Sequence, residues 1–184
     1  VYPYHPEGLW MEINNRPGFS RAYPHTESPT QLYRRSMYTY WKRTVAPPSM
    51  ATFDAPEREY CVVQRSRTNT PLQAFVMLHD PQFVEAARKL GERMMREGGA
   101  HPQTRIAQGF AWCTAREPNE TERALLERAF KEHLDRFQSD ADAVAKLLSV
   151  GSASVAPGVD AAELAAYTTI ARLLLNLSEF ITKG

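Results

Sequence analysis

Residues 70–99, TPLQAFVMLHDPQFVEAARKLGERMMREGG, decide the fold class, because they contain the start and stop signals of two helices. Thr70 is followed by a proline and, three residues on, by Gln73, which is typical of a capping box with proline at the first helical position. Asp80 precedes a proline in the same way and starts a second helix. The glycine pair at residues 98–99 ends that helix.

The second of these helices is predicted to be amphipathic. Its apolar stripe, which we expect to be buried, consists of Phe83, Ala87, Leu90 and Met94. The other side carries oppositely charged residues four positions apart, a spacing that supports a helix: Glu85 with Lys89, and Glu92 with Arg96.

Helical patterns continue along the rest of the sequence. Further helices are predicted at residues 103–115, from Asn119 to Phe137, from Asp140 to Gly151, and from Asp160 to Ile181. The last of them has a broad apolar face, made of Leu164, Tyr167, Ala171, Leu174 and Ile181 and widened by further leucines. A helix with so wide an apolar face is expected to lie at the centre of the bundle.

The N-terminal third gives different signals. Residues 32–43 alternate loosely and residues 60–67 are rich in β-formers, so they predict two strands of a small ribbon that must pack on helices. Residues 1–31, with their prolines, predict an extended arm that belongs to a longer parent domain. The predicted fold is therefore mainly α: an irregular bundle of about five to six helices over residues 32–184, with a small two-stranded β ribbon and an extended N-terminal arm.

Composition excludes several classes of function. The chain has 184 residues, of which 43% are apolar and 23% charged, as in ordinary globular proteins. Its net charge of +1 gives no support to nucleic-acid binding. No apolar run approaches the roughly 18 residues of a membrane span, so no membrane span is predicted. The opening at Val1, without a methionine, suggests a processed product or a piece of a longer protein.

Metal and cofactor signatures are missing from the sequence. The five histidines are not paired at ligand spacing, and there is no HExxH, CxxC or CxxCH motif, so we predict neither a metal nor a cofactor on this chain. Cys61 and Cys113 permit one disulfide. Because Cys113 shares a helical stripe with Ile106 and Phe110, a small buried core residue is the favoured interpretation.

Candidate ligand-binding residues gather in the N-terminal third: Arg35, Tyr38, Trp41, Arg65 and Arg67. Converging arginines can hold sulfate, phosphate or carboxylate through paired hydrogen bonds, and aromatic rings can stack on sugars. The alternative, which we favour, is that the arginines pair with acidic side chains of the same chain and that the rings serve packing or an interface.

Two carboxylates are candidate catalytic groups. Asp80 or Glu179 could act as a general acid or base if burial raised its pKa. The structural alternative makes Asp80 an N-cap, and it lets Asn176 and Glu179 tie the last helix to residues 68–80, because buried polar groups need partners.

Several runs together resemble a known family. They are RRSMYTYWKRT, MATFDAPEREYCVVQRSRTNTPLQAFVMLHDPQFVEAAR, AWCTAREPNETE and ARLLLNLSEFIT. They are similar to the C-terminal part of the planctomycete-type, cytochrome-associated family catalogued as domain of unknown function 1553. His79 departs from the family pattern, where an asparagine is expected before the Asp-Pro pair.

The resemblance implies a setting more than an activity. Such modules usually follow another domain of unknown function, often with a haem-c domain, in large exported bacterial proteins suspected of oxidative or polysaccharide-related work. It therefore implies export to the periplasm or beyond, a preceding domain as partner, and haem c on a linked domain.

Two functions from different classes follow. The first is an interaction or ligand-binding module that contacts the preceding domain or an anionic carbohydrate. The second is a redox or carbohydrate-active enzyme with Arg65, Arg67, Asp80 and Glu179 around a cleft. Saturation of these side chains by internal ion pairs would favour the module.

Overall fold

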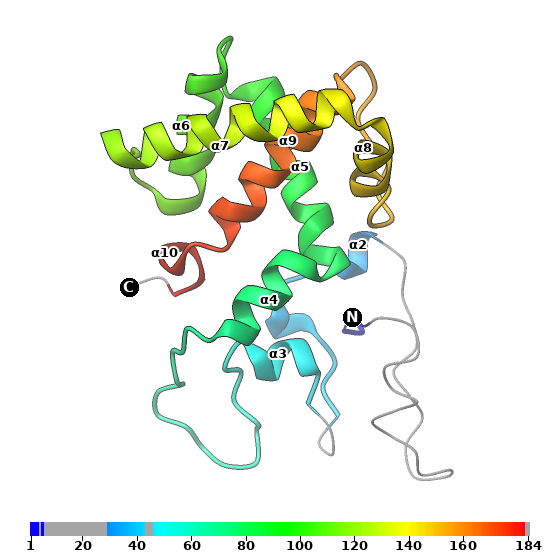
Figure 1. Ribbon diagram of the computed structural model, residues 1–184. Helices are drawn as coiled ribbons and strands as arrows, with labels where there is room; N and C mark the ends of the chain where they lie inside the picture. The colour runs from blue at the N-terminus through cyan, green and yellow to red at the C-terminus, as the bar shows by residue number, and fades with distance from the viewer. Residues whose placement is uncertain (4, 6–28, 43–45, 183–184) are drawn as a thin grey trace. The chain divides into compact units, whose positions relative to one another are not determined.

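The computed structural model describes residues 1–3, 5, 29–42 and 46–182 (Figure 1). The chain divides into two compact units, Val1–Arg67 and Thr68–Gly184, called here the N-terminal and C-terminal units. Most of the predicted arm, residues 1–31, lies outside the described residues. Among the described residues, no helix is long and apolar enough to cross a membrane.

The N-terminal unit contains short helical turns in place of the predicted ribbon. They are α2 (Pro29–Leu32), the 3-10 turn η1 (Ser36–Tyr38) and α3 (Pro48–Thr52). Residues 60–67 form neither helix nor strand, and the described part of residues 32–43 forms no ladder with them, so the ribbon prediction is wrong for this part of the chain. The physical reason is that β-forming residues need a neighbouring strand to pair with. The 3-10 turn η1 interrupts residues 32–43, the strand that the sequence suggested as that neighbour.

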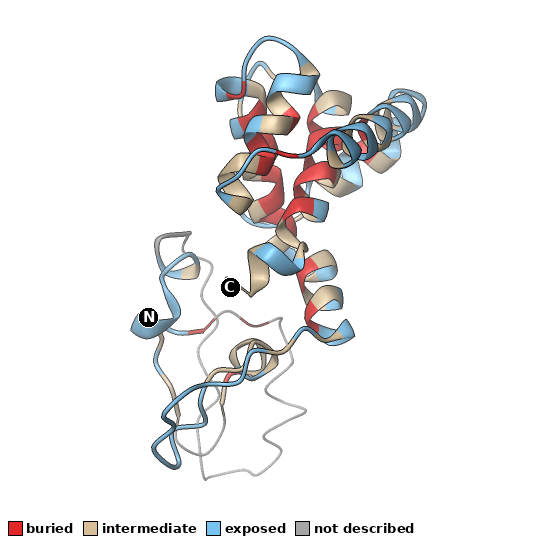
Figure 2. Ribbon diagram, turned by 90° about the vertical axis from the view of Figure 1, so that its left-hand side faces the viewer, coloured by how far each residue is buried: buried red, intermediate tan, exposed pale blue. Residues whose placement is uncertain are grey.

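The C-terminal unit is helical, as predicted. Its helices are α4 (Pro71–His79), α5 (Pro81–Glu97), α6 (Pro102–Thr114), α7 (Glu120–Ser139), α8 (Ala141–Leu148), α9 (Ala161–Leu175) and α10 (Ser178–Ile181). α9 is the central helix, because it packs on each of the others (Figure 1). Figure 2 shows the buried residues gathered where these helices meet.

The helix starts follow from the predicted caps. Thr70 Oγ1 accepts a hydrogen bond from the Gln73 N–H at 3.3 Å, and Gln73 Oε1 accepts one from the Thr70 N–H at 3.0 Å, which completes the capping box. Asp160 caps α9 through a bond of 2.7 Å from the Glu163 N–H. These bonds satisfy backbone donors that have no partner within the helix.

The core lies between α5, α6, α7 and α9. Its largest members are Met94, Ile106, Phe110, Phe130, Tyr167, Ile170 and Leu174. The rings of Phe130 and Tyr167 have centroids 4.5 Å apart. A Cβ on Gly91 would lie 3.1 Å from the Thr168 nitrogen, so glycine allows α5 and α9 to approach closely.

Two helix predictions need correction. The last helix does not run on to Ile181, because it ends at Leu175 with Asn176 as its cap, and α10 begins again at Ser178. On α5, the predicted charge pairs are replaced by others: Lys89 pairs with Glu92, and Arg96 pairs with Glu97. Glu85, Arg88 and Glu92 are buried. The cause is a loop, residues 149–156, that lies over them and supplies backbone partners.

Both cysteines are free, so no disulfide joins them. Cys113 is half-buried against the core, as the core interpretation predicted, and burial raises the pKa of its thiol to about 11. The described residues contain no group of three or more His, Cys, Asp or Glu side chains that could hold a metal ion.

Candidate functional site

Glu179, the first candidate acid, is held by an arginine that sequence reasoning did not select. Arg116 donates from Nε and Nη2 to the two carboxylate oxygens of Glu179 at 2.9 and 2.8 Å. The same guanidinium donates to both oxygens of Glu122 at 2.9 and 2.7 Å. Glu179 therefore anchors α10 to the start of α7, and its partner is not the segment of residues 68–80.

The Arg116 pairs have a clear electrostatic consequence. Hydrogen bonds from Arg116 and from the Asn119 N–H lower the pKa of Glu122 to about 2. The two carboxylates in turn raise the pKa of Arg116. A carboxylate held in this way stays ionised and is a poor proton donor near neutral pH.

Asp80, the second candidate, is the N-cap of α5. Its Oδ1 accepts a hydrogen bond from the Gln82 N–H at 2.9 Å, so the cap interpretation is confirmed. Burial raises the pKa of Asp80, and the N–H groups of Gln82 and Phe83 partly oppose that rise. The carboxyl is thus engaged with its own helix, although its raised pKa is the direction that a general acid requires.

The tie between α9 and α4 is made by Arg172. Its Nη2 donates to the carbonyl oxygen of Leu78, in the last turn of α4. Arg172 Nε and Asn176 Oδ1 are buried and have no partner among the described residues. The signal in the sequence was an arginine inside the apolar run of α9, a position where a buried guanidinium needs an acceptor.

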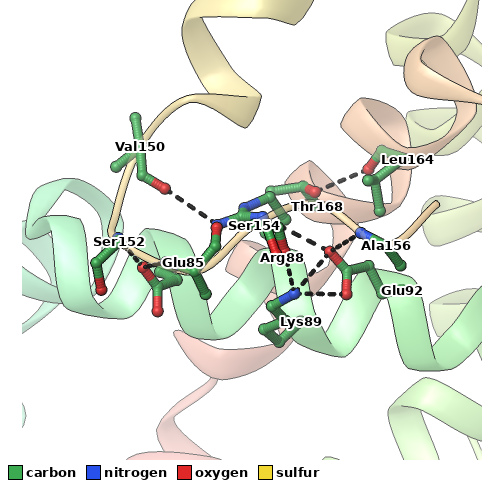
Figure 3. A network of polar contacts seen from close by, with 11 residues as sticks. Glu85, Arg88, Lys89, Glu92, Val150, Ser152, Ser154, Ala156, Leu164 and Thr168 are labelled. Atoms are coloured by element: carbon green, nitrogen blue, oxygen red, sulfur yellow. Dashed lines mark hydrogen bonds and ion pairs between the residues drawn. The ribbon is translucent and has the colours of Figure 1, made fainter. Parts of the chain in front are cut away.

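An extended polar network lies along α5, and sequence reasoning missed it (Figure 3). Glu85 Oε2 accepts hydrogen bonds from the N–H groups of Ser152 and Ala153, the latter at 3.0 Å. Arg88, with only 1% of its surface exposed, donates from Nη2 to the carbonyl oxygens of Ala153 at 2.6 Å and Val150 at 3.4 Å.

One helical turn further on, a second group of contacts continues the network. Lys89 Nζ donates to the Glu92 carboxylate at 2.8 Å and to the Ser154 carbonyl oxygen at 2.7 Å. Glu92 also accepts from the Ala156 N–H at 3.3 Å and lies 3.6 Å from Arg88 Nη1. We call the side chains of Glu85, Arg88, Lys89 and Glu92 the α5 clasp.

The α5 clasp binds the chain's own backbone. Its charged groups make hydrogen bonds with N–H and C=O groups of residues 150–156, which are at most half-buried, while Glu85, Arg88 and Glu92 are themselves buried (Figure 3). Gly151 has a φ of +92°, and a Cβ there would collide with the Glu85 carboxylate. The detectable signal was the spacing of three charged residues on one face of α5, at 85, 88 and 92, combined with the glycine-containing loop.

The candidate ligand-binding residues all belong to the N-terminal unit. Arg35, Arg65 and Arg67 are exposed, and Trp41 is half-buried. The guanidinium of Arg58 lies 4.7 Å from the Trp41 ring centroid, within cation–π distance. Trp41 Nε1 is buried without a partner among the described residues.

The N-terminal unit also presents a surface of exposed tyrosines. The Val1 nitrogen donates to the Tyr38 carbonyl oxygen at 2.9 Å, and the Tyr40 N–H donates to the Val1 carbonyl oxygen at 2.7 Å. This pairing places Tyr2 edge-on to Tyr40, with ring centroids 5.8 Å apart. Tyr38 is 58% exposed and Met37 70%. We call Tyr2, Met37, Tyr38 and Tyr40 the tyrosine patch.

Comparisons with known proteins assign the chain to a family. Neither the curated proteins nor the solved structures give a match. The family model described as PSD1, protein of unknown function (DUF1553), matches residues 1–130. That stretch contains the N-terminal unit, α4, α5, α6 and the first half of α7. Because the match covers more than half of the sequence, the chain belongs to the PSD1 family of proteins of unknown function (DUF1553).

Proposed function

We propose that this chain is an interaction module and that its tyrosine patch binds another domain of the same parent protein. The observation that carries the proposal is the exposure of Tyr38 and Met37, large side chains held in place by the pairing of Val1 with residues 38–40. Tyrosine and methionine are enriched in protein interfaces, because they supply large contact areas and tyrosine adds a polar end.

The engagement of the acidic candidates supports a module over an enzyme. Glu179 is bound to Arg116, and Asp80 caps α5, so each carboxylate already has a structural role in the C-terminal unit. A redox or carbohydrate-active enzyme built on these groups would first have to break those contacts. That alternative therefore has less support.

The setting of the module is proposed from the family resemblance. Related modules follow another domain of unknown function, often with a haem-c domain, in exported proteins. The proposed partner is thus the preceding domain of the parent, and the proposed location is the periplasm or the cell exterior. Fractionation of cells that express the whole parent protein would test the location.

A photo-crosslinker in the tyrosine patch tests the interaction. Replacement of Tyr38 by benzoylphenylalanine in the whole parent protein should give crosslinks to a domain outside this chain. The same replacement at Tyr33, an exposed tyrosine outside the patch, is the matched control and should give fewer. Crosslinks from Tyr38 that stay within residues 1–184, or equal yields at both positions, would contradict the proposal.

An anionic carbohydrate is a second proposed ligand. The stacking of Arg58 on Trp41, together with the exposed Arg35 and Tyr38 of the same unit, supports a cationic and aromatic surface. Sulfated and uronic oligosaccharides should raise the melting temperature, since ligand at 100 times its Kd adds about 2.7 kcal/mol. The shift should be lost in the double variant Arg35→Ala/Arg58→Ala, and its absence in the wild type would remove this candidate.

A further inference from the structure

We propose that residues 59–65, EYCVVQR, pair as a β-strand with the same segment of a second copy of this chain. The proposal concerns a surface outside the tyrosine patch and does not depend on the function proposed above. It rests on the exposure of the segment, on its unused backbone groups and on the order of its charges.

The segment exposes apolar side chains that ordinarily lie in sheets. Every residue from 56 to 67 is exposed. Tyr60 is 70% exposed and Val63 is fully exposed, and Val62 is exposed between them. Valine and tyrosine are among the strongest strand formers, and their contribution comes from packing against a neighbouring strand. The segment has the composition of a strand without the neighbour that would stabilise it.

Within the described residues, the backbone N–H and C=O groups of residues 59–66 make no hydrogen bond to the protein. The chain bends at residues 58–60 and 63–64, so the segment must straighten in order to pair. Figure 1 shows this stretch as part of the long loop between α3 and α4. Arg58 has a φ of +65°, so the turn there separates the segment from α3. A run of unpaired backbone groups beside β-forming side chains is a template for strand addition.

The order of the charges selects the partner and the direction. Glu59 lies at one end of the segment and Arg65 at the other, and neither makes an ion pair among the described residues. In a parallel pair of two copies, Glu59 would face Glu59 and Arg65 would face Arg65, which is repulsive. In an antiparallel pair, each Glu59 faces an Arg65. The segment is therefore complementary in charge to its own antiparallel copy.

The same reasoning fixes the register. With a twofold axis at Val62, that residue faces Val62 of the second copy, Cys61 faces Val63, and Glu59 faces Arg65. A shift of the axis by half a residue in either direction would place Glu59 opposite Ser66 or Gln64 and lose both ion pairs. A pairing about a twofold axis uses the same surface on both copies, so it closes at a dimer.

A ribbon of only two strands is marginally stable, so the dimer should be weak and concentration-dependent. Sedimentation equilibrium over a wide concentration series tests it. Arg65→Glu places two carboxylates opposite each other at both ends of the pair and should weaken dimerisation about tenfold or more. The swap Glu59→Arg/Arg65→Glu should restore it, and Arg35→Glu, an exposed arginine outside the segment, should leave it unchanged.

Disulfide trapping tests the register. In a Cys61→Ser background, Val62→Cys places two thiols directly opposite each other, where mild oxidation should join the copies rapidly. Val63→Cys in the same background is the matched control. Its thiol faces the serine hydroxyl introduced at position 61 of the second copy, and its own equivalent lies diagonally, roughly 7–8 Å away, so it should crosslink slowly.

Four outcomes overturn the proposal. In sedimentation, they are a wild-type chain that stays monomeric at every concentration, an Arg65→Glu variant that dimerises like the wild type, and a charge swap that fails to restore the dimer. In disulfide trapping, it is equal crosslinking at positions 62 and 63. Loss of folding in a variant would show as a changed circular-dichroism spectrum, and the milder substitution Arg65→Gln, which removes the charge without reversing it, then supplies the same test.

Discussion

Glu85 on α5 accepts a hydrogen bond from the backbone N–H of Ala153 at 3.0 Å, across a sequence separation of 68 residues. The carboxylate is buried, and it also accepts a hydrogen bond from the backbone N–H of Ser152 in the same loop. This arrangement fixes the loop between α8 and α9, and with it the start of α9, the central helix of the unit.

Removal of Arg88 should strongly destabilise the C-terminal unit. Arg88→Ala leaves the carbonyl oxygens of Val150 and Ala153 without their donor and Glu92 without its buried cation. Loss of one partner from such a buried network costs about 3–5 kcal/mol. Urea unfolding measures the change. Arg96→Ala, on the exposed side of the same helix, should cost less than about 1 kcal/mol, and equal effects would mean that the α5 clasp is not structural.

A glycine pair in one loop separates steric from conformational effects. Gly151 and Gly158 both have positive φ, and a Cβ would meet Glu85 at the first but nothing within 4 Å at the second. Gly158→Ala should therefore lower the free energy of unfolding by about 1 kcal/mol, which is the cost of placing alanine in the left-handed conformation. Gly151→Ala should cost more, because the clasp must also move. Thermal melts measure both variants, and an equal loss of stability in Gly151→Ala and Gly158→Ala would contradict the prediction.

The ion pair of Arg116 with Glu122 should make folding stability depend on pH in the acidic range. The folded-state pKa of Glu122, about 2, is lower than its ordinary value of 4.5, so the stabilisation is complete above pH 4.5 and is lost as the pH falls toward 2. Glu122→Gln keeps an acceptor for the Asn119 N–H but removes the charge. The difference in melting temperature between wild type and variant should shrink steadily over that range. Glu127→Gln, on the same helix, is the control, and a difference that does not change with pH would contradict the assignment.

Local signals explain why the helices could be predicted. Thr70, Asp80, Asn119 and Asp160 each act through a hydrogen bond two or three residues away, so the sequence alone contains both partners. The apolar stripes of α5 and α9 likewise follow from spacing within one helix.

Long-range partners explain what could not be predicted. Glu85 and Arg88 resemble a solvated helix face until the loop at residues 150–156, more than sixty positions later, covers them. The same holds for Arg116 with Glu179 and for Arg172 with Leu78. The ribbon failed for a related reason: residues 60–67 have the composition of a strand, but strand formation depends on a neighbour that composition does not specify.

The family match predicts the outcome of a truncation. Residues 1–130 contain the matched stretch, but α9, which supplies Tyr167, Ile170 and Leu174 to the core, lies beyond it. A chain that ends at residue 130 should therefore expose Met94 and Phe110 to water, bind a hydrophobic dye and unfold without cooperativity. A chain that ends at residue 176 keeps α9 and loses only α10, whose main polar anchor is the Arg116–Glu179 pair, so it should still melt cooperatively. Cooperative unfolding of the shorter chain, followed by circular dichroism, would show that the matched stretch folds without α9.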